Sequence, residues 1–301
     1  DVSGVRGGRN PAGVHLGRGR WAATTLDVVT TTGAARARRY YDANTWKFLL
    51  TGSGQRTIHR ELWAAGVTDV KGALHHVHDL VAAEIGAADR HVLDLGCGVG
   101  TAALYLARRL PVAVAGVSIS PEQVRLAQRF AGGSGPLRGT VRFATADFTA
   151  LPPELTGFDV AYAIESFVHA DPASAFFREA AGALRPGGRL LVIDDVRTGD
   201  PADPRLDDVR TGWHAATLAS VPEAAELAAA HGLVLAGDTD LSPYQRLGRP
   251  RDRLIAGLQP VLRQARSRSV WAESLVGGDA LQRCHRAGLL EYRMLRFVKG
   301  S

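Results

Sequence analysis

The chain has 301 residues, of which 46% are hydrophobic and 22% charged, and its formal net charge is +6. This composition is ordinary for a globular protein, and the length suits one large domain or a domain with a cap. No apolar run approaches the roughly 20 residues of a membrane-spanning helix, so a membrane partner is not expected. The two cysteines, Cys97 and Cys284, form no CxxC or Cys/His cluster, which argues against a metal site.

The positive charge is concentrated at the start of the chain. Residues 1–39 hold seven arginines against two acids, and the remainder is nearly neutral. No basic stripe with interleaved aromatic residues follows, so nucleic acid is not expected as a partner. Residues 1–35 lack periodicity, and we expect a mobile basic lead-in there. The chain does not open with the charged and apolar regions of a secretory signal, so we expect a cytoplasmic protein.

Helical structure is expected at 36–88, ahead of the first strand. The segment 39–50 is unusually aromatic, a glycine turn follows at 51–54, and a helical pattern covers about 71–86. These helices either pack on the edge of the sheet or form a lid over a substrate. Because pockets are apolar with a few polar groups, we favour the lid.

From residue 89 to 301, patterns typical of strands and helices alternate, which predicts a parallel sheet with right-handed crossovers. Two closing strands flank a helical insert at about 244–288. Strands are expected at 92–95, 112–117, 141–146, 158–164, 189–194, 233–241 and 291–298, and helices at 121–130, 171–184, 204–218 and 222–231.

Three glycines at alternate positions follow the first strand. Gly96, Gly98 and Gly100 let the backbone turn sharply and approach a ligand, and the helix after them directs its positive end at that ligand. The GxGxG spacing, with Asp94 two residues earlier and no Lys-Ser/Thr behind it, resembles motif I of class I S-adenosylmethionine (SAM) methyltransferases. The resemblance implies SAM as the cofactor and a Rossmann-like seven-stranded methyltransferase sheet.

The resemblance extends to the ends of the next strands, where open α/β sheets bind their ligands. Many class I methyltransferases have Asp or Glu at the end of the second strand, where this chain has Ser118. The segment 116–120, together with Gln123, instead resembles the sterol, geranyl diphosphate and cyclopropane-forming C-methyltransferases. Helix capping would explain Asp94 or Ser120 without a ligand, and turn formation would explain Asp147. The resemblance instead implies that the cofactor is bound by Asp94, Gly96, Gly98, Gly100, Ser118, Gln123, Asp147 and Phe148.

Glu165, after the fourth strand, is the main candidate for catalysis. Geranyl diphosphate methyltransferases carry Glu-Ser at this position, as this chain does. Methylation of an alkene leaves a carbocation, which a partly desolvated carboxylate stabilises and deprotonates. His169 is the competing base, for an oxygen or nitrogen acceptor. Tyr41 joins these candidates because aromatic faces stabilise cations.

The motifs YYDxNT, FLxxGxG and IHRxLW (residues 40–63), together with ESFVH, resemble bacterial prenyl diphosphate C-methyltransferases of terpenoid biosynthesis. The resemblance implies methyl transfer to an alkene carbon of isopentenyl or geranyl diphosphate. An O- or N-methyltransferase of secondary metabolism is the alternative, and a nucleotide-binding protein without methyltransferase activity is another. The need for Mg²⁺ is left open, as is the oligomeric state, for which a homodimer is considered. The substrate candidates are Tyr40, Trp46, Phe48, His59, Arg60, Phe167, Arg197, Tyr244 and Arg246.

Overall fold

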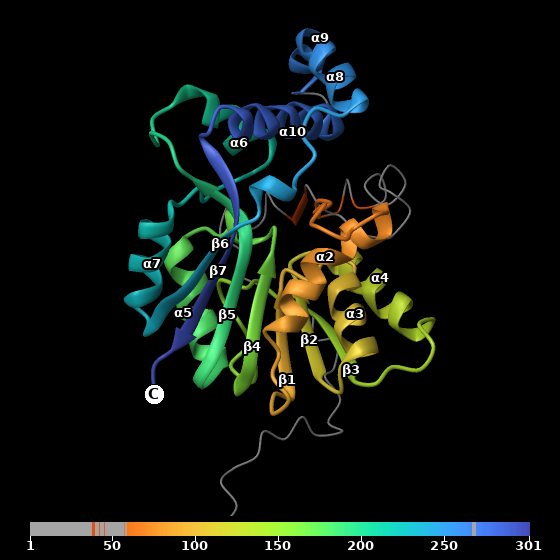
Figure 1. The fold of residues 1–301 in the computed structure, drawn as a ribbon, viewed down its shortest axis with the longest axis vertical. Coiled ribbons are helices and arrows are strands. Elements are labelled where there is room, and N and C mark those ends of the chain that lie inside the picture. The colour runs from red at the N-terminus through yellow and green to blue at the C-terminus, as the bar shows by residue number, and fades with distance from the viewer. Residues whose placement is uncertain (1–37, 40–41, 43–44, 46–56, 58, 267–268) are drawn as a thin grey trace, which may run out of the picture.

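The computed structural model describes residues 38–39, 42, 45, 57, 59–266 and 269–301 (Figure 1). Within them, seven strands form one sheet: β1 (His91–Leu95), β2 (Ala113–Ser118), β3 (Thr140–Thr145), β4 (Phe158–Ile164), β5 (Leu184–Arg197), β6 (Leu233–Asp240) and β7 (Leu290–Lys299). The order is β3-β2-β1-β4-β5-β7-β6, and β7 runs antiparallel to both of its neighbours, whereas the other four pairs are parallel. The Rossmann-like fold class predicted from the sequence is confirmed.

Helices flank the sheet, and a further group lies above its upper edge (Figure 1). Among the described residues, no helix is long and apolar enough to span a membrane. The α-helices are α2 (Val70–Ala83), α3 (Thr101–Arg109), α4 (Pro121–Gly132), α5 (Ala173–Ala183), α6 (Asp207–Gly212), α7 (Val221–Ala229), α8 (Pro250–Gly257), α9 (Gln259–Ala265) and α10 (Val270–Arg286), and the short 3₁₀ helices are η1 (Phe167–His169), η2 (Pro204–Leu206) and η3 (Ser242–Tyr244).

The core lies on both faces of the sheet, because side chains alternate along each strand. Val92 packs with Val77 of α2 and Leu106 of α3. Its neighbour Leu93 belongs to the opposite cluster, which contains Phe176 of α5. Burial on both faces explains why β1 and β4 are apolar almost throughout.

Two elements differ from their predicted bounds by more than three residues at one end. β5 begins at Leu184 rather than at residue 189, and its register on β4 shifts across the intervening Pro-Gly-Gly turn. The helix predicted at 204–218 ends at Gly212. Of the predicted lid at 36–88, α2 covers the sheet through Val77 and Val81.

Ser120 begins α4, and the structure bears out its predicted capping role. Its side chain accepts a hydrogen bond from the Gln123 backbone N–H at 3.2 Å, and Pro121 occupies the first helical turn. We expect Ser120→Ala to lower the free energy of unfolding by about 1 kcal/mol, because it leaves a helix N–H without its partner. Chemical denaturation of the two proteins measures this. An unchanged midpoint would exclude the cap as a source of stability.

Candidate active site

Asp94 lies near the end of β1, and only 2% of its surface is exposed. The Tyr162 hydroxyl on the neighbouring strand β4 donates a hydrogen bond to its Oδ2 at 2.7 Å. Burial raises the pKa of Asp94 to about 7, although the Tyr162 hydrogen bond opposes that shift. A carboxylate so placed is costly without a cation beside it, so the site fits a positively charged ligand group.

The glycine loop after β1 has two distinct surfaces. A Cβ atom added at Gly96 would lie 2.5 Å from Ser166 Cβ, so this glycine packs the loop against the end of β4. A Cβ added at Gly98 would meet no atom within 4 Å. Both residues have positive φ angles, 94° and 52°, which glycine adopts at little cost. Gly98 therefore presents bare backbone toward open space, where a ligand can approach it.

These surfaces predict different effects for two matched substitutions. Gly96→Ala should lower the free energy of unfolding by about 2–3 kcal/mol, because the methyl group overlaps Ser166. Gly98→Ala should cost only about 1–2 kcal/mol of backbone strain but should weaken SAM binding. Thermal unfolding and isothermal titration separate the two effects. A Gly98 variant that binds SAM as wild type does would contradict the ligand-facing role.

Ser118 ends β2 and Gln123 lies in the first turn of α4, and their side chains bind each other. The Ser118 hydroxyl donates to Gln123 Oε1 at 2.8 Å, and Gln123 Nε2 donates to Thr45 Oγ1 at 3.3 Å. Ser120 also donates a hydrogen bond to Asp42. Residues 42 and 45 thus contact the sheet edge on which the sequence predicts the ribose.

Asp147 follows β3 in a turn of its own. Its Oδ1 accepts hydrogen bonds from the Thr149 backbone N–H at 2.8 Å and from the Thr149 hydroxyl at 2.6 Å. Phe148 packs edge-on against Phe176, with ring centroids 5.6 Å apart. The turn role considered from the sequence is therefore present, and Asp147 Oδ2 takes no part in it.

The strand pairing brings these positions to one edge of the sheet. Asp94 pairs with Gly116 on one side and with Tyr162 on the other. Ser118 pairs with Thr145, two residues before Asp147. The predicted cofactor residues are therefore close in space, because parallel strands end together.

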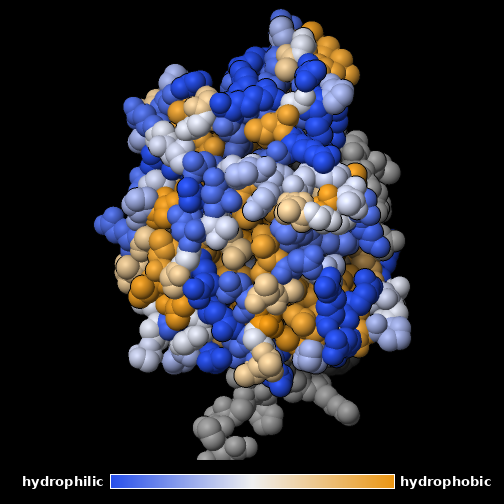
Figure 2. Space-filling view, viewed as in Figure 1, coloured by the Kyte–Doolittle hydropathy of each residue, from blue (hydrophilic) through white to orange (hydrophobic). Residues whose placement is uncertain are grey.

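A cavity of about 290 Å³ lies beyond the end of β4. Residues from the segment 57–61, the region 245–255 and helix α10 form its walls, and Glu165 contributes from β4. On the face shown in Figure 2, the surface over α10 is mostly hydrophilic, with smaller apolar patches. Four of the predicted substrate or catalytic residues line the cavity: His59, Arg60, Glu165 and Arg246. Two tryptophans that the sequence analysis did not identify line it as well, Trp213 and Trp271.

Glu165 is held by two hydrogen bonds to one oxygen. Its Oε1 accepts from the Arg60 backbone N–H at 2.9 Å and from the Tyr292 hydroxyl at 3.0 Å. Glu165 has a φ angle of 49°, in the left-handed region that a residue with a side chain rarely occupies. Such strain is common at functional sites, where the surrounding structure enforces it.

A buried ionic network supports Glu165. Asp195 accepts hydrogen bonds from both terminal nitrogens of Arg60, and its Oδ1 lies 2.7 Å from His285 Nε2. Burial alone would raise the pKa of Asp195, but the charges of Arg60 and His285 hold it well below its usual range. The pKa of the adjacent Asp194 lies well above its usual range, because it is buried and faces Asp195. Arg60 is thus fixed as a cation beside Glu165.

The comparisons with known proteins agree with this geometry. A family model described as a methyltransferase domain matches residues 92–188. The 27-O-demethylrifamycin SV methyltransferase of Amycolatopsis mediterranei is 32% identical over 194 residues, which are 63% of this chain and 71% of that protein. The chain belongs to the SAM-dependent methyltransferase family. The family predicted from the sequence is therefore confirmed.

Other relatives match less of their length. Methyltransferase GfsG of Streptomyces halstedii is 41% identical over 124 residues, 41% of this chain and 42% of that protein. The chain spans less than half of the first curated relatives it matches. Among solved structures, the [4+2]-cyclase SpnF (TM-score 0.70, 24% identity) covers 89% of this chain and 96% of its own. Geranyl diphosphate C-methyltransferase of Streptomyces coelicolor A3(2) (TM-score 0.62, 18% identity) covers 90% and 99%. These two establish the methyltransferase fold.

Several predicted residues lie away from this cavity. Phe167 packs in the core, with ring centroids 5.0 Å from Phe176, so its assignment to the pocket wall does not match its position. One terminal nitrogen of Arg197 lies 2.6 Å from each carboxylate oxygen of Glu223. This ion pair neutralises the charge that was predicted to bind a diphosphate. Tyr244 packs edge-on against His76 at 6.1 Å.

Five further predicted residues are not found in the cavity: His169 lies elsewhere, and four aromatic residues lie outside the described part of the chain. The Nδ1 of His169 lies 3.0 Å from the His214 carbonyl oxygen, and burial lowers the pKa of His169. His169 does not line the cavity. The aromatic residues predicted near the N-terminus lie outside the described residues: Tyr40, Tyr41, Trp46 and Phe48.

Proposed function

We propose that this methyltransferase methylates an alkene carbon of a prenyl diphosphate. The observation that carries the proposal is the Glu165 carboxylate, fixed by Arg60 and Tyr292 at the wall of the cavity. Its side chain is only 10% exposed, so its charge is poorly screened by water. Such a carboxylate stabilises the carbocation that alkene methylation leaves, and it accepts the proton that the cation loses.

SAM, when bound, supplies an electrophilic methyl group. We assign its methionine part to Asp94, whose buried carboxylate would accept hydrogen bonds from the ammonium. Gly98 leaves its backbone accessible, and Gly96 and Gly100 shape the loop around it. Ser118 and Gln123 are assigned to the ribose, and exchange of their mutual hydrogen bond would free both. Asp147 Oδ2 and Phe148 are assigned to the adenine.

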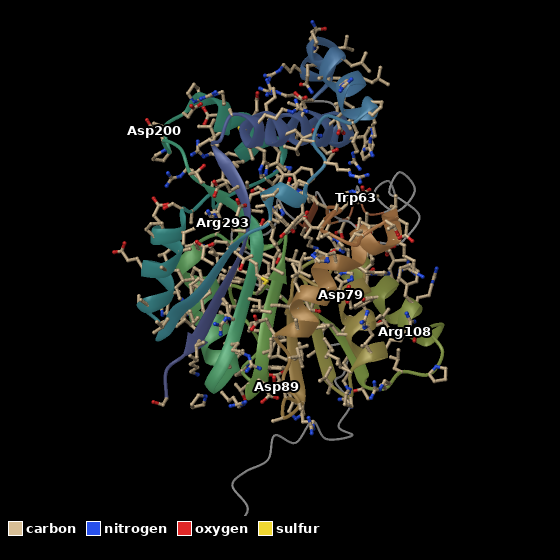
Figure 3. The ribbon with its side chains drawn as sticks, viewed as in Figure 1. Trp63, Asp79, Asp89, Arg108, Asp200 and Arg293 are labelled. Atoms are coloured by element: carbon tan, nitrogen blue, oxygen red, sulfur yellow. The ribbon has the colours of Figure 1, made fainter. Side chains whose placement is uncertain are left out.

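The diphosphate is assigned to the arginine-rich part of the cavity. Arg249 lies 3.1 Å from Glu61, and Arg60 is paired with Asp195. Arg246 lies over the Trp63 ring at 3.4 Å from its centroid, where the upper helices meet the segment before α2 (Figure 3). No ion pair to Arg246 or Arg251 occurs among the described residues, so both charges are available to an anion.

Two buried polar atoms in the same walls add hydrogen-bonding capacity. Thr57 Oγ1 and Gln245 Nε2 have no hydrogen-bond partner in the described part of the chain. Both residues line the cavity. Buried polar groups are almost always paired, so these atoms favour a substrate with a polar head group. The described residues contain no cluster of His, Cys, Asp and Glu suited to a metal ion, so Mg²⁺ would enter with the diphosphate.

The test is incubation with labelled SAM and a panel of isopentenyl, dimethylallyl, geranyl and farnesyl diphosphates, each with and without Mg²⁺. We expect label in one diphosphate and a product heavier by one methylene unit. If SAM binds but no diphosphate is labelled, the proposed substrate is wrong.

O-methylation of a small metabolite is the second candidate, favoured by a different observation. His285 lines the cavity and is paired with the buried Asp195, an arrangement suited to a general base for a hydroxyl group. The relatives named above include a 27-O-demethylrifamycin SV methyltransferase. The base would then be His285 rather than the predicted His169. Hydroxylated acceptors labelled by wild type and by Glu165→Gln, but not by His285→Asn, would establish this candidate.

A further inference from the structure

Three histidines form a continuous chain from the cavity to the surface of α2. His59 lines the cavity, and its Nε2 lies 2.9 Å from His78 Nε2. His78 is completely buried, and its Nδ1 lies 3.2 Å from Nδ1 of His75, which is partly exposed. The rings of His59 and His78 are nearly perpendicular, with centroids 4.7 Å apart, an arrangement compatible with a hydrogen bond between their ring nitrogens.

One carbonyl fixes the direction of every hydrogen bond in this chain. The Arg60 carbonyl oxygen, 3.1 Å from His59 Nδ1, only accepts, so Nδ1 carries the hydrogen. In neutral His59, Nε2 is then an acceptor, and His78 Nε2 must donate to it. Neutral His78 therefore accepts at Nδ1, and His75 Nδ1 donates. Each nitrogen within the chain has one partner and one role.

The spacing between His59 and His78 fits a direct hydrogen bond better than a shared metal ion. Two nitrogens on a tetrahedral zinc ion at its usual bond length are about 3.3 Å apart, whereas His59 and His78 approach to 2.9 Å. The described residues also form no group suited to a metal. A hydrogen bond accounts for the distance without any ion.

Burial favours the neutral form of all three histidines. Burial lowers the pKa of His59, with Glu165 opposing, and lowers that of His78 further, with His59 and His75 adding to the effect. The pKa of His75 is lowered by burial, by His59 and by Lys71 and Arg109, against Asp79. Tyr105 of α3 stacks on His75 and donates a hydrogen bond to Asp79, which Figure 3 labels on α2.

We propose that His59 gains and loses its proton through His78 and His75, so that this chain is a path for proton exchange between the wall of the cavity and the surface of α2. A proton bound by His75 Nε2 releases the His75 Nδ1 proton to His78, and His78 passes its Nε2 proton to His59. His59 then donates from both nitrogens, and the reverse sequence returns the proton to solvent. No ring has to turn: three protons each move by one step, and the net result is the transfer of one positive charge from His75 to His59.

The path allows the charge of His59 to change with the ligand that the cavity holds. An anionic head group beside His59 favours the imidazolium, and the chain supplies that proton from the surface. When Glu165 takes the proton of the methylated substrate, it becomes neutral and no longer stabilises the His59 imidazolium. His59 then returns its proton through the chain to solvent. This consequence rests on the proposed diphosphate substrate, whereas the chain itself is present without it.

The first experiment needs no substrate. In the full chain with ¹⁵N-labelled histidine, we expect a scalar coupling between Nε2 of His59 and Nε2 of His78, which only an N–H···N hydrogen bond transmits. After a drop in pH, protonation of His59 should be slower by at least about tenfold in His78→Gln, because a positioned proton carrier contributes about 10²–10⁴-fold. His75→Gln, which leaves the buried core intact, should slow it in the same direction.

His76→Gln is the matched control, because His76 lies on the same helix but packs against Tyr244 outside the chain. His59 should be protonated at the wild-type rate in this variant. Absence of the coupling, or an equal rate in His78→Gln and wild type, overturns the proposed path.

The second experiment adds geranyl diphosphate. Calorimetry in buffers of different ionisation enthalpy should show uptake of a proton on binding, and stopped-flow dye measurements should show slower uptake in His78→Gln. If geranyl diphosphate does not bind, the proposed substrate fails while the first experiment still decides the path. If it binds without proton uptake by His59, the role of the path in the cavity is overturned.

Discussion

Glu165→Gln is expected to lower the turnover of a prenyl diphosphate by about 10²–10⁴-fold. The amide keeps an oxygen that accepts the hydrogen bonds from Arg60 N–H and the Tyr292 hydroxyl, so the fold and the cavity should be preserved. What is lost is the negative charge that stabilises the cation and the lone pair that takes its proton. SAM binding should change little, because Asp94 lies on a different strand. Rapid-quench measurement of the first turnover with labelled SAM tests this.

Glu61→Gln is the matched comparison, since Glu61 also places a carboxylate in the cavity wall. That carboxylate is already neutralised by Arg249 at 3.1 Å and accepts a hydrogen bond from Trp63 Nε1 at 3.1 Å. Its loss should affect turnover far less than the loss of Glu165. Equal losses in the two variants would mean that Glu165 acts only through the general charge of the cavity. Full activity of Glu165→Gln on a diphosphate would remove the proposed mechanism.

The residues at the sheet edge were predictable from sequence because the topology alone brings them together. Asp94 and Ser118 lie in the last two residues of their strands and Asp147 lies two residues after β3, and parallel strands end at one edge whatever the packing above them. Glu165 was predictable for the same reason. Its supports were not: the Arg60 backbone N–H and the Tyr292 hydroxyl come from positions 105 and 127 residues away in the sequence.

The upper wall of the cavity shows the limit of sequence patterns more clearly. Trp271 and His285 lie on α10, whose helical period is readable, but nothing local indicates that this face covers the end of β4. Asp194 and Asp195 are adjacent and both buried, yet they differ in role. Asp194 accepts backbone hydrogen bonds, and Asp195 binds Arg60 and His285. Only the alternation of side chains along β5, combined with the tertiary structure, separates them.

Asp94→Asn should weaken SAM binding by about 10²-fold, because a charged hydrogen-bonded pair contributes about 1.5–3 kcal/mol and the amide also presents an N–H to the ammonium. The wild-type affinity should itself depend on pH. An ammonium favours the carboxylate, whose pKa without ligand is raised to about 7, so the affinity should fall as the pH drops below that value. The limit is about tenfold per pH unit. Isothermal titration between about pH 6 and about pH 8 measures both effects, and the variant should lose the pH dependence.

Tyr162→Phe independently tests whether the pH dependence of SAM binding comes from Asp94. The Tyr162 hydroxyl donates to Asp94 and lowers its pKa, so removing the hydroxyl should move the pH profile of SAM binding to higher pH.

The same carboxyl should affect the free energy of unfolding in the opposite sense. The folded protein keeps the Asp94 proton over a range in which the unfolded chain has lost it, so the contribution of this group to stability is present at low pH and is lost as the pH rises through about 7. SAM-free Asp94→Asn should therefore gain stability relative to wild type above that pH. A flat binding profile in both wild type and Tyr162→Phe would separate Asp94 from the ammonium and move the cofactor away from the end of β1.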